Sequence, residues 1–314
     1  MAPWTHTYLS PQTERRMCCT STEPAQNFKQ YIDADDGKNR YEPLTLDEHW
    51  NSEHMKSVRR RMMAGEELPE CKVCNNQLLN ADVYRNWFNS MYKRYESDIW
   101  LHTDPDGTTS MKPISFDYRF SNLCNFKCRM CGPMLSSSAE AEARRMKSWS
   151  IPGDPWMMPP VRDMISEFQD TQIEKEFSDA IEEKRIEEIY WVGGEPLMYA
   201  QHWKYLQRIV DLGYPEQVML RYNTNLSRVN YKKQNLWELL SHFPRWNMLA
   251  SLDATGQIGE YIRTGLKYNK FIENLEQGIE TATGREQRID LDLTITTPGL
   301  LDLKNMFDLS IKYR

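Results

Sequence analysis

Three cysteines lie close together in the segment SNLCNFKCRMCGP, which covers residues 121–133. Cys124, Cys128 and Cys131 are separated by three residues and then by two. Three thiolates do not complete a structural zinc site, because such a site takes four protein ligands. They can hold three corners of an iron–sulfur cube and leave the fourth iron open to a small ligand. A zinc knuckle completed by a distant histidine or cysteine is the alternative that the spacing leaves open.

Four further cysteines precede this segment in two pairs, Cys18 with Cys19 and Cys71 with Cys74. A Cys-x2-Cys combined with a distant pair is typical of a zinc site or of a second iron–sulfur cluster. The N-terminal stretch MAPWTHTYLS lacks the basic and apolar parts of a secretory signal. The seven cysteines of the chain are therefore expected to be metal ligands or catalytic thiols in a reducing cytoplasm rather than disulfides.

Short strands alternating with helices are expected to position the triple-cysteine segment. Strand-like runs cover residues 114–120, 189–196, 218–225, 246–256 and 288–299. Helical periodicity follows in residues 200–213, 231–243, 268–282 and 300–314, and residues 150–160 are expected to be an irregular insertion. Strand followed by helix, repeated, predicts an α/β fold with a parallel sheet and helices on its outside.

The first hundred residues are predicted to be mostly helical. One amphipathic helix is expected from Leu46 to a stop at Gly65, with Trp50 and Met55 at helical spacing, and another over residues 81–95. The polar, turn-rich residues 101–113 then predict a boundary. It divides the chain into a cysteine-bearing domain of residues 1–105 and a second domain of residues 106–314.

The triple-cysteine segment resembles the Cys-x3-Cys-x2-Cys signature of the radical SAM superfamily, which follows the first strand of a barrel. GGEP at residues 193–196, YNTN at 222–225 and SLD at 251–253 follow in the family's order at strand ends. The resemblance covers residues 114–314 and implies a partial (β/α)6-type barrel, of which five strands are visible. The sixth is expected to be missing through C-terminal truncation, with a divergent closure as the alternative.

The resemblance implies that Cys124, Cys128 and Cys131 bind a 4Fe-4S cluster and carry catalysis. S-adenosylmethionine would be cleaved there to a 5′-deoxyadenosyl radical that takes hydrogen from a peptide or small-molecule substrate. The implied cofactor-binding residues are Gly193, Gly194, Glu195, Asn225, Ser251, Asp253 and Arg263. The glycines would let backbone atoms approach the ammonium group. An electron donor such as ferredoxin or flavodoxin is implied as a partner.

One of these residue assignments, that of Arg263, has an open alternative, and two neighbouring residues also need comment. Arg263 either pairs with the methionine carboxylate or forms a surface salt bridge. Asn223 is a ligand or a turn residue, and Met130 stands where many relatives carry an aromatic residue near the adenine. The oxidation, crosslinking or epimerisation that would follow is not predicted by any motif.

The N-terminal part resembles the twitch module of radical SAM proteins, a shortened relative of the SPASM domain placed here ahead of the barrel. This implies an auxiliary 4Fe-4S cluster on Cys18, Cys19, Cys71 and Cys74, with zinc as the alternative. In that group a further cysteine precedes a Pro-Trp pair, and Pro3 leaves no room for it. Either both adjacent cysteines bind, or His6 substitutes, or the chain begins too late.

Composition excludes some classes of protein. The formal net charge is −6 and the mean hydropathy is −0.72, and no apolar run approaches the roughly 20 residues of a membrane-spanning helix. An acidic balance disfavours nucleic-acid binding, so an RNA-modifying enzyme is the least favoured alternative. A non-catalytic metal-binding or interaction protein that retains the fold is the main alternative to an enzyme.

Overall fold

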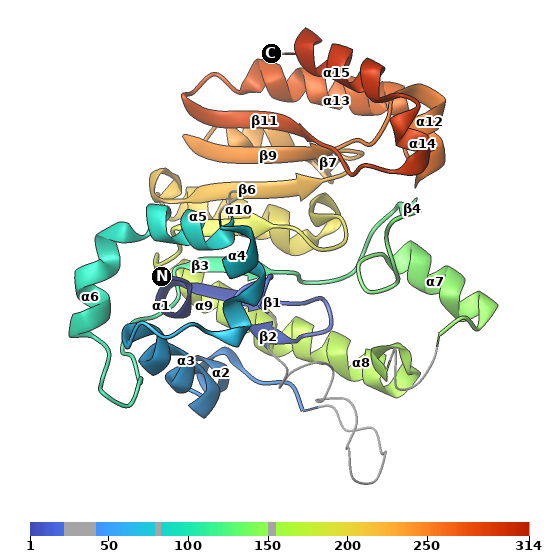
Figure 1. Cartoon of the computed structure of the whole chain (residues 1–314). Coiled ribbons are helices and arrows are strands. Elements are labelled where there is room, and N and C mark those ends of the chain that lie inside the picture. The colour runs from blue at the N-terminus through green and yellow to red at the C-terminus, as the bar shows by residue number, and fades with distance from the viewer. Residues whose placement is uncertain (22–41, 79–82, 150–154, 314) are drawn as a thin grey trace. The chain divides into compact units, whose positions relative to one another are not determined.

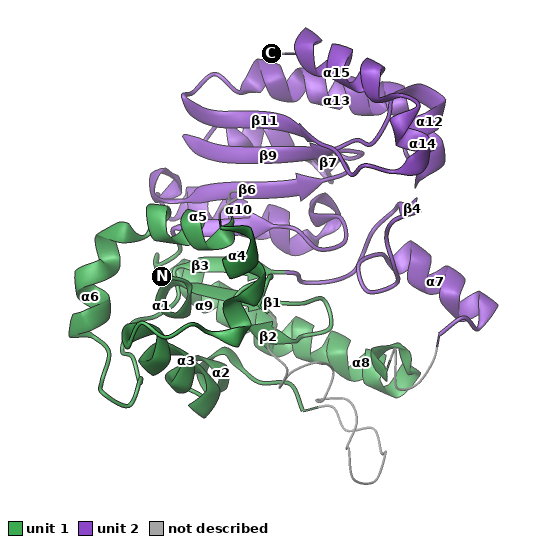
Figure 2. Cartoon of the chain, viewed as in Figure 1, with its two compact units in different colours: residues 1–118, 150–186 green, residues 119–149, 187–314 purple. Residues whose placement is uncertain are grey.

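The computed structural model describes residues 1–21, 42–78, 83–149 and 155–313 (Figure 1). The chain forms two compact units (Figure 2). The first comprises Met1–Tyr118 and Ser150–Ile186, and the second Arg119–Trp149 and Glu187–Arg314. The division into domains of residues 1–105 and 106–314 stays a prediction. The first compact unit takes in residues on both sides of that predicted boundary.

Four parallel strands form the main sheet of the second unit, in the order β11-β9-β6-β5. Each of them was predicted, and their bounds are β5 (Glu188–Trp191), β6 (Met219–Thr224), β9 (Arg245–Ser251) and β11 (Glu286–Asp292). The α/β prediction is confirmed, and the described strands form an open sheet, as expected for a partial barrel.

Burial alternates along the central strands of this sheet. On one face Leu220, Trp246 and Met248 are fully buried. On the other face Asn223 and Ser251 are partly exposed. Because parallel strands are usually buried on both faces, a polar face at their carboxyl ends indicates a ligand site.

Helices and short ladders complete the second unit. The helices that follow the main strands are α10 (Ala200–Asp211), α11 (Leu236–Leu240), α12 (Gly256–Ile262), α13 (Tyr268–Thr281), α14 (Thr297–Leu300) and α15 (Leu303–Lys312). The segment after residue 119 contributes α7 (Ser137–Met146), which begins at the N-cap Ser136. Two small antiparallel ladders join β4 (Lys127–Cys128) to β10 (Arg263–Thr264), and β7 (Asn230–Tyr231) to β8 (Gln234–Asn235).

A three-stranded ladder in the order β3-β1-β2 lies in the first unit. Strand β1 (His6–Leu9) pairs in parallel with β3 (Ser115–Tyr118) and antiparallel with β2 (Arg15–Arg16). Strand β1 was not anticipated. All four of its residues are buried, so it lacks the alternation of apolar and polar residues that marks a strand in sequence.

The prediction of one helix from Leu46 to Gly65 is wrong, because the segment forms α2 (Leu46–Trp50) and α3 (Glu53–Met63). The Ser52 side chain accepts a hydrogen bond from Met55 N and starts the second helix. The Arg59 guanidinium donates to Trp50 O at 2.6 Å, which satisfies a carbonyl at the end of the first.

The remaining helices of the first unit come from both of its stretches of chain, before and after residues 119–149. They are α1 (Ala2–Thr5), α4 (Lys72–Gln77), α5 (Tyr84–Met91), α6 (Glu96–Leu101), α8 (Pro159–Phe168), a π-turn over Gln169–Ile173, and α9 (Glu174–Glu182). The helix expected over residues 81–95 corresponds to α5 and a short 3-10 turn, and residues 81–82 lie outside the described residues. Residues 150–154 of the expected insertion do too.

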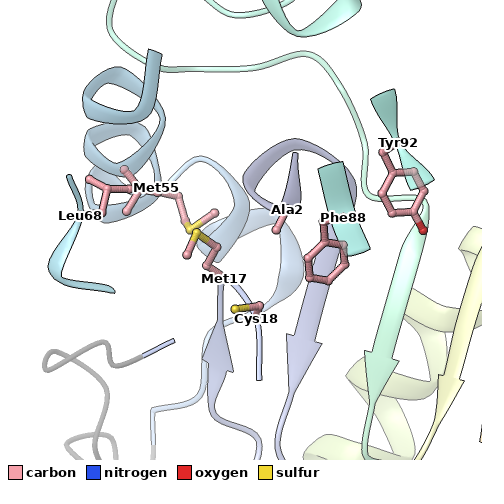
Figure 3. Packing of buried hydrophobic residues seen from close by; sticks show 8 residues of the cluster. Ala2, Met17, Cys18, Met55, Leu68, Phe88 and Tyr92 are labelled. Atoms are coloured by element: carbon pink, nitrogen blue, oxygen red, sulfur yellow. The ribbon is translucent and has the colours of Figure 1, made fainter. Parts of the chain in front are cut away.

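Two kinds of contact hold the first unit together. Buried apolar side chains form the cluster of Ala2, Met17, Cys18, Met55, Val58, Leu68, Phe88 and Tyr92 (Figure 3). A buried ion pair joins Arg15 Nη2 to Glu176 Oε2 at 2.5 Å, and Tyr118 hydrogen-bonds to both side chains at 3.0 Å. No described helix is both long enough and apolar enough to cross a bilayer.

Candidate active site

Serines at the start of α7 hold the first part of the cysteine loop. Ser137 Oγ accepts from Cys124 N at 3.1 Å, and Ser138 Oγ donates to Cys124 O at 2.8 Å. Ser136 Oγ donates to the carbonyl of Phe126 at 2.7 Å, and the Phe126 ring is buried. Hydrogen bonds from the serines at the start of α7 therefore hold the backbone around Cys124 in place.

The ladder between β4 and β10 holds the second part of the loop. Its register places Arg263 opposite Cys128, and Arg263 Nη1 lies 4.0 Å from Cys128 Sγ. Next in the loop, Arg129 N donates to Ile262 O at 2.9 Å, and the Arg129 guanidinium stacks 3.8 Å from the centre of the Tyr261 ring. Hence the loop is anchored on both sides of Cys128.

A buried acid orients Arg263. Arg263 Nη2 donates to Asp253 Oδ1 at 2.9 Å, and its Nε lies 2.7 Å from Asp253 Oδ2. Thr294 N also donates to Asp253 Oδ1, at 2.9 Å. Burial alone would lower the pKa of Arg263, but the hydrogen bond and charge of Asp253 raise it above its ordinary value. Arg263 is only 9% exposed, so the ion pair is not a surface salt bridge.

The glycine turn after β5 packs directly on the cysteine loop. Glu195 N donates to Leu123 O at 2.7 Å, and Gly194 N donates to the Tyr199 hydroxyl at 2.7 Å. A Cβ at position 194 would lie 2.3 Å from Leu123 O, and Gly193 has a φ of +128°. Both positions therefore require glycine, one for close approach and one for its backbone conformation.

Glu195 ties the end of β5 to the end of β6. Its carboxylate accepts hydrogen bonds from Thr224 Oγ1 at 2.6 Å, Asn225 N at 2.7 Å and Leu197 N at 3.1 Å. Burial raises the pKa of Glu195 to about 7, although these hydrogen bonds act in the opposite direction. Asn225 Nδ2 in turn lies 3.9 Å from Cys124 Sγ.

These elements enclose one cavity of about 270 Å³ in the second unit. Asp253 was predicted for this site but does not line the cavity. It forms an ion pair with Arg263, which does. The others line it together: Cys124, Cys128, Cys131, Gly193, Gly194, Glu195, Asn225, Ser251 and Arg263. Met130 lines it as well.

The donor set fits an iron–sulfur cluster with one open iron. Three soft thiol donors line one cavity, and Glu195, the carboxylate in its wall, is already bound by Thr224 and the backbone. Burial raises the pKa of the Cys124 thiol to about 12, so bound iron would be needed to hold it as a thiolate. Among the described residues, no group of three or more His, Cys, Asp or Glu side chains is placed so that it could hold a metal ion.

A polar network centred on Asn223, which also lines this cavity, was not predicted from the sequence. Tyr190 donates its hydroxyl proton to Asn223 Oδ1 at 2.6 Å, and Asn223 Nδ2 donates to Asp292 Oδ2 at 3.0 Å. Asn223 lies within β6 rather than in a turn, and Asp292 is paired with Ser251. The signal in the sequence was the alternation of Asp290 and Asp292 along a predicted strand.

The N-terminal cysteines line a second cavity, of about 330 Å³, in the first unit. Cys18, Cys71 and Cys74 belong to its lining, and Cys19 does not. His6, considered as a substitute ligand, bonds through Nδ1 to Ser115 Oγ at 2.7 Å within the β1–β3 pair.

The family model described as "Radical SAM superfamily" matches residues 118–302. The chain therefore belongs to the radical SAM superfamily, as the cysteine motif predicted. No curated protein matches the chain.

Solved structures of other proteins show a distant likeness. A structure of native anSMEcpe with bound AdoMet and Kp18Cys peptide is 16% identical, with a TM-score of 0.37, over 62% of this chain and 46% of that one. SuiB of Streptococcus suis bound to S-adenosylmethionine is 15% identical, with a TM-score of 0.42, over 83% of this chain and 50% of that one. The chain thus spans about half the length of these proteins.

Proposed function

We propose that the chain is a radical SAM enzyme acting on a peptide or small metabolite. It would cleave S-adenosylmethionine reductively and use the 5′-deoxyadenosyl radical to abstract hydrogen from that substrate. One observation carries the proposal: the three motif cysteines line one cavity together with the glycine turn and Arg263. When bound, a reduced 4Fe-4S cluster supplies one electron, which breaks the S–C5′ bond of S-adenosylmethionine.

Each residue of the cavity has a role in this proposal. Cys124, Cys128 and Cys131 hold the cluster, and the serines of α7 fix the loop that carries them. Arg263, held in place by Asp253, binds the methionine carboxylate, because a guanidinium matches a carboxylate in charge and shape.

Other residues of the cavity lining are assigned to the rest of S-adenosylmethionine. Gly193 and Gly194 leave backbone atoms accessible to the ammonium group, while the Glu195 carboxylate keeps their turn attached to β6. Asn225 and Ser251 supply polar contacts from the carboxyl ends of β6 and β9.

An auxiliary 4Fe-4S cluster on the N-terminal cysteines completes the proposal. Cys18, Cys71 and Cys74 supply soft donors at one cavity, as an iron–sulfur cluster requires. A ferredoxin or flavodoxin as electron donor and a cytoplasmic location are part of the same proposal.

The test is anaerobic reconstitution, followed by iron and sulfide analysis and an assay for 5′-deoxyadenosine with dithionite. We expect about eight iron atoms per chain for two clusters and formation of 5′-deoxyadenosine. Cys128→Ala should lose about four iron atoms and all cleavage, whereas the matched variant Cys74→Ala should lose as much iron and keep cleavage. Cleavage that survives Cys128→Ala would refute the assignment of the active site. Zinc bound by the N-terminal cysteines would refute the auxiliary cluster.

A further inference from the structure

A leucine in the left-handed backbone conformation follows β6. Leu226 has a φ of +51°, which costs an L-residue conformational energy because its Cβ comes close to the following carbonyl. Its side chain is fully buried, and its backbone N–H donates to Thr224 Oγ1 at 3.0 Å. The surrounding structure must therefore hold Leu226 in a conformation that the backbone alone disfavours.

The neighbours of this leucine on both sides bind the cysteine loop. Asn225 Nδ2 donates to Asn125 Oδ1 at 3.1 Å, and Asn125 Nδ2 donates to Ser227 Oγ at 3.0 Å. Ser227 N also donates to Asn225 Oδ1 at 3.0 Å, which fixes the orientation of the Asn225 amide. We call these three residues the clasp. Because Asn125 directly follows Cys124, the clasp holds the part of the loop that carries the first motif cysteine.

The clasp leaves one hydrogen of the Asn225 amide for a sulfur atom. A side-chain amide nitrogen carries two hydrogens, and Asn125 accepts one of them. Asn225 Nδ2 lies 3.9 Å from Cys124 Sγ, within reach of an N–H···S hydrogen bond. Hydrogen bonds to the sulfurs help to set the reduction potential of an iron–sulfur cluster. A donor at this place favours the reduced cluster, because reduction adds negative charge to the sulfurs.

A buried asparagine of α13 holds the leucine between the two clasp residues. Asn274 is fully buried, and its Nδ2 donates to Leu226 O at 2.8 Å. Its Oδ1 has no hydrogen-bond partner among the described residues. An apolar side chain at this position would avoid the cost of an unpaired buried oxygen. Because such costs are most often found at functional sites, the amide of Asn274 indicates a role beyond packing.

We infer that Asn274 is a positioning residue for the cysteine loop. By binding Leu226 O, it keeps the clasp closed and the Asn225 amide beside Cys124 Sγ. The result is a higher reduction potential of the bound cluster than the loop would give without this amide. The inference rests on the active-site cluster of the proposed function.

The first test measures the reduction potential in a double-mutant cycle. The full chain carrying Cys74→Ala, which keeps only the active-site cluster, is reconstituted anaerobically and titrated without S-adenosylmethionine under electron paramagnetic resonance. At a fixed potential, Asn274→Leu should lower the ratio of reduced to oxidised cluster about threefold, as expected for the loss of one weak hydrogen bond. Asn225→Leu should lower it at least as much, and the double variant should match Asn225→Leu. An unchanged ratio in Asn274→Leu, or additive effects, would overturn the inference.

Gln287→Leu is the matched control. Like Asn274, Gln287 donates an amide hydrogen to a backbone carbonyl, Phe243 O at 2.9 Å, but it lies near the amino end of β11. The control should leave the ratio unchanged, and a shift equal to that of Asn274→Leu would overturn the inference. If Asn274→Leu does not fold, Asn274→Ser gives the same information, because the serine hydroxyl is one bond shorter than the amide nitrogen.

A second test needs no cluster. Amide hydrogen exchange is measured by NMR in the unloaded full chain. The Ser227 amide, which is bonded to Asn225 Oδ1, should exchange about tenfold faster in Asn274→Leu than in the unaltered chain. In Gln287→Leu its exchange should be unchanged. Equal exchange of this amide in Asn274→Leu and in the unaltered chain would overturn the inference.

The two measurements separate the inference from the proposed function. If the chain binds no cluster at the three motif cysteines, the proposed function and the inference both fail. If the cluster is in place and Asn274→Leu leaves its reduction potential unchanged, the inference alone fails.

Discussion

At the scale of single residues, the glycine turn shows how closely the active-site elements pack. A Cβ at position 194 would lie 2.3 Å from Leu123 O and 2.7 Å from Asn122 O. Both are backbone atoms of the cysteine loop, which cannot move aside as the end of a flexible side chain can. Glycine at this position is therefore a condition for the contact between the two loops.

Gly194→Ala should lower the free energy of unfolding by about 3 kcal/mol, because the added methyl group forces the turn away from the cysteine loop. Denaturant unfolding of the purified chain measures this change. Gly132→Ala is the control, since a Cβ at position 132 meets no atom within 4 Å. It should change stability by less than about 0.5 kcal/mol. Equal effects of the two substitutions would contradict the packing argument.

A buried histidine makes stability depend on pH. Burial lowers the pKa of His202 to about 3, and its Nε2 is 3.0 Å from the Tyr222 hydroxyl. The unfolded chain takes up a proton at this residue below its ordinary pKa of about 6.5, and the folded chain does not until about pH 3. The free energy of unfolding therefore decreases as the pH falls through this window.

His202→Gln should remove this contribution. At pH 5 the unaltered chain should have lost about 2 kcal/mol of stability through His202, relative to pH 7.5. Denaturant unfolding at both pH values measures the loss of unfolding free energy on acidification. This loss should be about 2 kcal/mol smaller in the variant than in the unaltered chain. If the variant and the unaltered chain lose the same stability on acidification, His202 does not titrate as described.

At the scale of elements, helix caps and short ladders decide where the chain changes direction. Ser52 starts α3 only two residues after α2 ends, and Arg59 satisfies the carbonyl of Trp50 from the new helix. The hydrophobic periodicity runs through both helices, which is why it predicts one. The apolar residues of the two helices keep the same helical spacing, and this periodicity hides the helix start that the capping residue Ser52 marks.

Ser52→Ala should cost about 1 kcal/mol of unfolding free energy, because Met55 N loses its partner at the start of α3. Thermal unfolding of the two chains measures the difference. Ser166→Ala provides the comparison, since Ser166 is exposed within α8 and its hydroxyl donates only to Arg162 O. It should change stability by less than about 0.5 kcal/mol. A smaller effect at Ser52 than at Ser166 would contradict the cap.

The ladder between β4 and β10 connects Arg263 to the cysteine loop. Arg263→Lys should weaken S-adenosylmethionine binding about tenfold, because a lysine cannot form the fork that Asp253 orients. Calorimetric titration of the reconstituted protein measures this change. Arg129→Lys is the matched control, as its guanidinium stacks on Tyr261 and is absent from the cavity lining. Equal weakening by both substitutions would remove Arg263 from the binding site.

Much of the second unit could be predicted because β5, β6 and β9 are each followed by a motif that has a chemical reason. The cysteine motif, the double glycine and Ser251 mark strand ends, and the structure brings them to one cavity. Asp292 was missed because a lone acid at a strand end carries no motif. Strand β1 was missed because a short buried strand has no periodicity. That Cys19 is absent from the N-terminal cavity could not be predicted, because no spacing rule separates two adjacent cysteines.

At the scale of the whole molecule, each compact unit has its own cysteine-lined cavity. Metal binding stabilises the folded state, because the ligands come together only on folding. Removing iron by chelation should therefore lower the midpoint of thermal unfolding by at least about 5 °C. In Cys128→Ala the same treatment should produce a smaller shift, arising from the first unit alone. An unchanged midpoint after iron is removed would contradict metal binding in both units.

The first unit is built from two stretches of chain with the cysteine loop between them. During translation, Arg15 emerges 161 residues before Glu176, the acid that neutralises it. At typical synthesis rates this delay is roughly ten to thirty seconds. A guanidinium meant for full burial has no counter-charge in that time, so the first unit closes only after the whole cysteine loop has left the ribosome. The three thiols of the loop are thus exposed to the cell's iron carriers and oxidants before the N-terminal unit is complete.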